Sequence, residues 1–166
     1  MENRIYYKTQ YHWNVNTIKY EAMTVFGIEA VSNQKEIQWN IRELQKTYCK
    51  IQSQTRRNRN TFITMVHVSE DGSYRIIVAG FIKRAEFKEY KIPTSLYAMV
   101  TIRGHFLGKI RKTIQKTEAY FEDKWLEENK YSYDQAEYIF WTRERHTVFW
   151  KNIVDVLFAI HHAEYY

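Results

Sequence analysis

The sequence of 166 residues has one cysteine, one proline and five glycines, and it lacks a long apolar run. A single cysteine, Cys49, excludes an internal disulfide and a thiol-rich metal site, which fits a reducing compartment. Scarce proline and glycine exclude collagen-like and linker-like chains. The longest apolar stretch, around residues 153–160, is interrupted by Asp155 and is too short to span a bilayer. Because the N-terminus also lacks the apolar segment of a secretory signal, the sequence predicts a cytoplasmic protein.

Aromatic residues and basic residues are the two abundant classes. The chain has 14 tyrosines, nine phenylalanines and five tryptophans, and its 25 lysines and arginines exceed its 19 aspartates and glutamates. So many rings are more than a core of this size needs, and a ring-lined ligand cavity is one ordinary destination for the surplus. A mildly basic surface admits nucleic acid, an acidic protein or an anionic ligand as partner. The length fits a single domain over residues 1–166.

The chain contains an internal repeat. Residues 20–27 and 97–104 both read Tyr-x-x-x-Thr-x-x-Gly, 77 positions apart. The same shift carries the apolar segment 76–79 onto the segment 153–156. A repeated supersecondary unit fixes an architecture more firmly than residue propensities do, so the sequence predicts one short fold that occurs twice.

In the first unit, residues 17–26 have the mixture of β-branched, aromatic and polar residues of a half-buried strand, which is expected to end at Gly27. Asn33 is expected to cap a helix that runs from about residue 33 to 52. Segments 61–68 and 74–83 flank Ser-Glu-Asp-Gly-Ser, a hairpin signal. The helix is supported by apolar residues that step by four and three: Ile37, Ile41, Leu44, Tyr48 and Ile51.

The second unit repeats this order, with a strand over 96–103, a helical stripe from Leu107 to Trp125, and a closing hairpin of 135–142 with 152–161. Residues 90–93 should be extended, since proline disfavours helix in the residue before it. The predicted fold class is therefore α+β. Two βαββ repeats, at about residues 15–84 and 90–162, would form one antiparallel sheet with pseudo-twofold symmetry and two long helices on one face. A cleft between the helices would be floored by the sheet.

The order of these signals resembles the GyrI-like domain, also called the effector-binding domain of AraC-type and MerR-type transcription activators. The resemblance extends from about Ile18 to Ile160. The residues that carry it are the strand ending at Gly27, the hairpin Val68–Tyr74, Ile77–Gly80, Ile92-Pro93-x-x-x-Tyr97, Ile102-Arg-Gly104, Trp125-Leu126 and Tyr131.

This resemblance implies a concave pocket at the junction of the two units that binds small, lipophilic and often cationic molecules. Family members that stand alone include protein inhibitors of DNA gyrase, and some relatives hydrolyse strained small molecules. The family often carries a glutamate in the strand after its Trp-Leu helix, followed two residues later by tyrosine. Ile139 and Trp141 occupy those positions here, and Glu137 is the nearest acid on the same predicted strand face. Ala159 stands where the family has a proline in its last strand.

The candidate ligand contacts are aromatic residues and two acids set in apolar strand patterns. A buried carboxylate needs water, a cationic side chain or a ligand cation, and rings around it would form a cage for an organic cation. Packing in the core is the alternative role for each aromatic ring, above all for Trp125, which belongs to the helical stripe. The candidates are Trp39, Tyr97, Trp125, Glu137, Tyr138, Trp141 and Asp155.

Arg56, Arg57 and Arg59 form the densest basic cluster, which either is solvated or docks on an acidic protein partner. The pair His161–His162 does not predict a metal site, because adjacent strand residues point to opposite faces. The sequence has no Gly-rich phosphate loop and no nucleophile elbow, so it implies no cofactor. No pattern of a DNA-reading helix is present.

The sequence therefore predicts a stand-alone bacterial domain that binds a small amphipathic molecule, for effector sensing in transcription regulation or for multidrug sequestration. Two other functions stay open. One is inhibition of a protein partner of the gyrase type through the arginine cluster. The other is hydrolysis of a strained electrophile, with Glu137 orienting the water.

Overall fold

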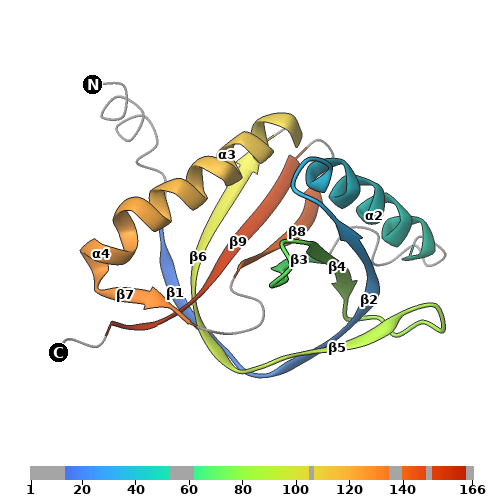
Figure 1. Cartoon of the computed structure of the whole chain (residues 1–166), viewed down its shortest axis with the longest axis horizontal. Coiled ribbons are helices and arrows are strands. Elements are labelled where there is room, and N and C mark those ends of the chain that lie inside the picture. Colours follow the sequence, from blue (N-terminus) through green and yellow to red (C-terminus); the bar gives the residue numbers. More distant parts are fainter. Residues whose placement is uncertain (1–13, 53–61, 105–106, 135–139, 149–150, 164–166) are drawn as a thin grey trace.

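The computed structural model describes residues 14–52, 62–104, 107–134, 140–148 and 151–163, and for 104, 107–111, 140–141, 143–148 and 151–152 it describes the backbone alone. Its strands form one curved sheet, with two long helices on the same side (Figure 1). The elements in chain order are β1 (Asn16–Tyr20), β2 (Met23–Ser32), α2 (Ile37–Gln52), β3 (Phe62–Val68), β4 (Tyr74–Gly80), β5 (Lys88–Ile92), β6 (Ser95–Gly104), α3 (Leu107–Tyr120), the π-helical turn η1 (Phe121–Trp125), α4 (Leu126–Asn129), β7 (Tyr131–Tyr133), β8 (Phe140–Val148) and β9 (Lys151–His162).

The sheet consists of two halves of four antiparallel strands. Hydrogen bonds follow the order β1-β6-β9-β8-β3-β4-β2-β5, and β7 pairs with the end of β9. The halves meet where β3 pairs with β8 over Phe62–Met65 and Trp141–Glu144. Each half contains a βαββ unit, β2-α2-β3-β4 in one and β6-α3-β8-β9 in the other. The predicted fold class is confirmed.

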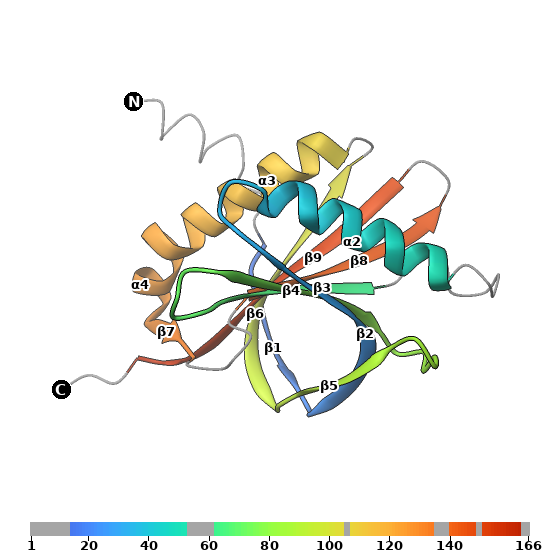
Figure 2. The ribbon, with the colours of Figure 1, turned by 45° about the vertical axis from the view of Figure 1, so that its right-hand side comes forward.

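A two-stranded ribbon joins the two ends of this sheet. β1 continues into β2 and β5 into β6, and the two long strands pair with each other: Tyr20 lies opposite Ser95, and Met23 opposite Ile92. Where they cross, the backbone N–H of Ala22 donates to Oγ1 of Thr94 at 2.9 Å. The ribbon curls beneath the central strands (Figure 2). The sheet thus has a helix-side face and an enclosed face.

Successive side chains of a strand point to opposite faces of the sheet, and here both faces carry buried apolar residues. On the enclosed face, buried residues from both halves form one cluster, including Ile77, Tyr97 and Leu157. On the helix side there are two clusters, one with Tyr48 and Val78 beneath α2, and one beneath α3 and η1. Because both faces are buried, an apolar strand pattern alone does not reveal which residues face the helices.

The two helices match their predicted apolar stripes, but α2 begins at Ile37 and not at residue 33. Asn33 makes the predicted type of hydrogen bond in the turn before the helix: its Oδ1 accepts from the backbone N–H of Glu36 at 2.9 Å. Residues 34–36 form a turn before the helix. No helix in the described ranges has both the length and the apolarity that crossing a membrane requires.

Two predicted strand boundaries are wrong. The predicted strand 17–26 is two strands, β1 and β2, because Glu21 and Ala22 are poor strand formers and lie at the crossing of the ribbon. Gly27 lies in the middle of β2, which continues to Ser32. Of the predicted hairpin strand 135–142, residues 135–139 lie outside the described residues, and residues 140–142 belong to β8. Lys88–Ile92 is extended, as the following proline predicts.

The pseudo-twofold axis is visible in the strand registers, but the uniform shift of 77 residues is wrong. A shift of 78 carries the hairpin β3–β4 onto β8–β9, for example Thr64 to Thr142. A shift of 72 carries β1–β2 onto β5–β6, for example Met23 to Ser95. The three identical residues shared by segments 20–27 and 97–104 were too few to fix the register of the first strand of each repeat. Because Thr64 also pairs with Thr142, the axis passes between these two residues.

Candidate functional site

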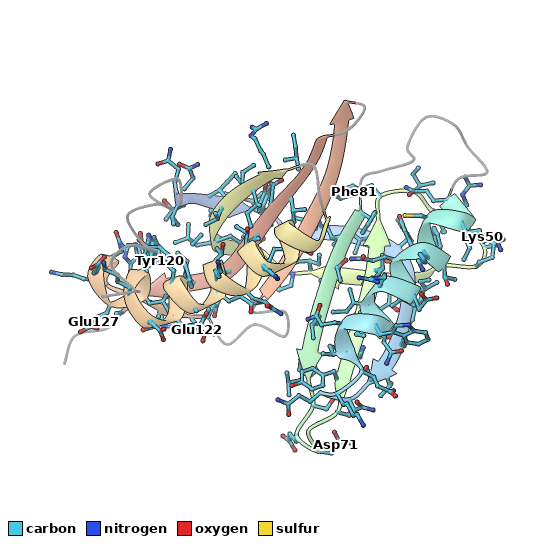
Figure 3. All side chains as sticks on the ribbon, turned by 90° about the horizontal axis from the view of Figure 1, so that it is seen from above. Lys50, Asp71, Phe81, Tyr120, Glu122 and Glu127 are labelled. Atoms are coloured by element: carbon cyan, nitrogen blue, oxygen red, sulfur yellow. The ribbon has the colours of Figure 1, made fainter. Side chains whose placement is uncertain are left out.

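The central strands β3 and β8 lie between the helices. α2 packs on β2 and β4, whereas α3 packs on β6 and β9, and Figure 3 shows the two helices on either side of the middle of the sheet. Thr64 and Thr142 are on the helix-side face here, in register with Val78 and Val156. We use the name inter-helix strip for the surface between the two helices. It consists of Gln45, Thr64 and Thr142 together with the acids Glu118 and Glu122 on the α3 side.

The centre of this strip is polar although it is buried. Thr64 and Thr142 retain 5% and 9% of their exposure. Gln45 of α2 donates from Nε2 to Oγ1 of Thr64 at 2.9 Å. The hydroxyl of Thr142 has no hydrogen-bond partner within the described ranges.

The α3 side of the strip is acidic and aromatic. β7 and β8 share one edge of β9, since Ile160 pairs with Leu96 on its other edge and with Tyr133 on this one. Tyr133 is therefore on the side of α3 that faces the other half of the sheet. Its hydroxyl donates to Oε1 of Glu122 at 3.1 Å. Glu122 and Tyr120 project from opposite sides of this helical segment (Figure 3).

Glu118 lies one turn before Glu122 on the same side of the helix. It is half-buried, and the described part of the chain offers its carboxyl neither an ion pair nor a hydrogen bond. Burial and the neighbouring Glu122 carboxylate raise the pKa of Glu118 to about 7. Burial, together with Glu122, also raises the pKa of the Tyr133 phenol. A half-buried carboxyl with a raised pKa, such as that of Glu118, is typical of binding or catalytic sites.

Stacked rings hold this end of the molecule in place. Phe121 is fully buried and stacks on Phe158 at 3.9 Å and on Trp125 at 4.8 Å between ring centroids. The stack continues from Trp125 to Tyr131 at 5.4 Å. η1 is a π-helical turn, in which the N–H of Leu126 donates to the carbonyl of Phe121. Such turns recur at functional sites. Here the turn brings Phe121 and Trp125 into one stack.

Three of the sequence-predicted site residues are at positions on the enclosed face and not on the strip. Tyr97 and Asp155 are fully buried there, and Trp141 has its register position between Leu157 and Met65, which belong to the same cluster. Oδ1 of Asp155 accepts a hydrogen bond from Oγ1 of Thr101 at 2.7 Å. Position 143, an arginine, lies opposite Asp155 in the register. This acid is thus built into the core.

The other predicted residues are scattered. Trp125 is buried in the ring stack, whereas the side chain of Trp39 is 63% exposed on α2. The structure does not bring either of them together with Tyr97 and Asp155. Glu137, Tyr138, Arg56, Arg57 and Arg59 lie outside the described residues.

His161 and His162 are both exposed on β9, and the ring of His162 lies 4.8 Å from that of Tyr131. Within the ranges that the structure describes, no group of three metal-ligating side chains is placed to hold a metal ion. Cys49 is partly buried and borders the cluster beneath α2.

Sequence reasoning missed Glu118, Thr64 and Thr142. A signal for each was present. Glu118 follows Thr117 at the edge of the apolar stripe of α3, Thr64 interrupts an apolar strand pattern, and Thr142 follows the aromatic pair Phe140-Trp141. The two threonines could have been paired only with the correct shift of 78 residues between the hairpins.

We expect Glu118→Gln to stabilise the protein at about pH 8 but not at about pH 4. The folded pKa of about 7 exceeds the ordinary value of 4.5, so the folded chain binds more protons between these values, and stability falls as the pH rises through this range. The substitution removes that loss, by about 1 kcal/mol once solvent screening is allowed for, or a few degrees in Tm. Thermal unfolding of both proteins across this pH range tests it. A pH-independent difference would contradict the shifted pKa.

The sequence matches no protein-family model and no curated protein. Solved structures do match. SAV2435, determined with bound tetraphenylphosphonium, has a TM-score of 0.67 at 12% identity, over 89% of this chain and 94% of that one. An integron cassette protein from Vibrio cholerae has a TM-score of 0.65 at 12% identity, over 89% and 95%. The EcmrR C-terminal domain has a TM-score of 0.55 at 9% identity, over 90% and 98%. At these identities the likeness shows a shared fold.

Proposed function

We propose that this chain is a small-molecule-binding domain of the GyrI-like type that takes an amphipathic organic cation on the inter-helix strip. The observation that carries the proposal is Glu118, a half-buried carboxyl without a partner among the described residues. A cation placed beside it would offset both its burial and its repulsion from Glu122. The binding of tetraphenylphosphonium by SAV2435, which shares the fold, supports the cationic class.

The surroundings of Glu118 suit a cation with an apolar body. Tyr133 presents an aromatic ring beside the acids, 5.8 Å from the ring of Phe121. Aromatic faces attract organic cations through their quadrupoles and give dispersion contacts to apolar substituents. Such binding would serve either effector sensing or sequestration. The contacts proposed here exclude Tyr97 and Asp155, because both are buried on the other face of the sheet.

The test is equilibrium titration with tetraphenylphosphonium, followed by tryptophan fluorescence or calorimetry, at about pH 8 where Glu118 is ionised. We expect Glu118→Gln to weaken binding about tenfold, the effect of losing one close ionic contact of about 1.4 kcal/mol. Glu127→Gln is the matched control, since Glu127 is exposed on α4 and the charge change is the same. No binding by the natural sequence, or equal weakening by both substitutions, would refute the proposed site.

The protein-inhibitor hypothesis rests on the three arginines outside the described residues and stays a prediction from sequence. The same holds for hydrolysis assisted by Glu137. Among the described residues, no observation favours either over binding.

A further inference from the structure

The pseudo-twofold axis brings two threonine hydroxyls together in the middle of the inter-helix strip. Thr64 and Thr142 correspond to each other in the two repeats and are also paired across the seam between β3 and β8. Thr64 interrupts an otherwise apolar strand face, whereas Thr142 lies on its strand face between Phe140 and Glu144 in the sequence. Val78 and Val156, their neighbours in the sheet, are fully buried. We call these two threonine hydroxyls the floor of the strip. They offer hydrogen bonds at positions where apolar side chains would offer none.

The hydrogen bonds of these hydroxyls are incomplete. Oγ1 of Thr64 accepts from Gln45, so one of its lone pairs is used. Thr142 as a whole residue retains 9% of its exposure, and its hydroxyl has no partner in the described part of the chain. A ligand that covers the strip displaces water from Thr142. A buried hydroxyl left without a partner is costly, so a ligand that supplies one is favoured over a ligand that does not.

We propose that the ligand is a protonated amine that donates N–H hydrogen bonds to this floor, and not a fully substituted onium ion. The inference rests on the proposed function, because it is the acidic side of the strip that favours a positively charged ligand. The Thr142 hydroxyl accepts a hydrogen bond, and an ammonium group with at least one N–H is a cation that can donate to it while its positive charge lies beside the Glu118 carboxylate. A quaternary nitrogen or phosphorus presents only C–H groups.

The experiment compares two cations that differ by one methyl group, dimethyl(naphthylmethyl)ammonium and trimethyl(naphthylmethyl)ammonium. Both carry one positive charge and the same ring system. We expect the dimethyl ion to bind the natural sequence roughly tenfold more tightly, the typical effect of one hydrogen bond to a buried partner. Dissociation constants come from naphthalene fluorescence or calorimetry. Equal affinities, or tighter binding of the trimethyl ion, would overturn the inference and leave the proposed function standing.

Variants of Thr142 test whether its hydroxyl causes the preference for the dimethyl ion. Thr142→Val keeps the shape of the side chain and should reduce the ratio of the two affinities to within about twofold. Thr142→Ser keeps the hydroxyl and should retain the ratio. Thr24→Val makes the same change at an exposed position on β2 and should also retain it. A ratio unchanged in Thr142→Val would overturn the inference. Binding of neither ion to the natural sequence would overturn the proposed function and, with it, this inference.

Discussion

Gly27→Ala should lower the free energy of unfolding by about 3 kcal/mol, at the upper end for overpacking of a core. Gly27 lies opposite Ala79 in the register of β2 and β4. A methyl group added at Gly27 would overlap the carbonyl oxygen of Val78 and both Cα and Cβ of Ala79. Two of these atoms belong to the backbone, so no side-chain rotation relieves the overlap. Urea denaturation followed by circular dichroism measures the change.

Gly72→Ala is the matched control. Gly72 has a positive φ of 82° in the turn between β3 and β4, and a Cβ there would meet open space. Only conformational strain opposes the substitution, so we expect a loss of about 1 kcal/mol. If Gly27→Ala cost no more than Gly72→Ala, the close approach of β2 to β4 would be incorrect.

Phe121→Ala should cost about 3–5 kcal/mol, the usual range for truncating a buried phenylalanine. Its ring is fully buried between those of Phe158 and Trp125, nearly parallel to both at 7° and 15°. The substitution leaves a cavity and also removes the ring contacts of η1. Chemical denaturation gives the loss in stability, and near-ultraviolet circular dichroism should lose the signal of the stacked rings.

Trp39→Ala is the control for the second prediction, because Trp39 is 63% exposed. We expect a change within about 0.5 kcal/mol, as for other surface substitutions. Comparable losses in Phe121→Ala and Trp39→Ala would show that the ring stack is not the core of the second half.

The order of elements could be predicted from sequence because the helical stripes, the hairpin turns and the proline connector are local signals. The register between the repeats could not. Tyr20 and Tyr97 begin similar sequence motifs, yet Tyr20 corresponds to Ile92 in the fold. The six-residue difference between the two shifts lies between the first strand and the hairpin of each unit, where the α3–η1–α4 segment is longer than α2. Insertions of this kind leave strand patterns intact and displace every later position.

The candidate site was harder to predict, because the sheet is buried on both faces. Tyr97 and Asp155 have the apolar neighbours expected of a ligand pocket, but those neighbours form the enclosed core. The sequence places Glu118 at the edge of the apolar stripe of α3 but does not show what surrounds its carboxyl. Its environment depends on β7, which brings Tyr133 beside Glu122. Contacts between a helix and a strand that follows it in the chain depend on tertiary structure, which hydrophobic periodicity does not encode.

The most direct test of the account is a crystal structure of the protein with dimethyl(naphthylmethyl)ammonium. We expect the ammonium group to lie beside the Glu118 carboxylate with its N–H directed at the Thr142 hydroxyl, and the naphthalene ring to lie beside Tyr133, between α2 and α3. A ligand found instead in the enclosed core, against Asp155 and Tyr97, would contradict it.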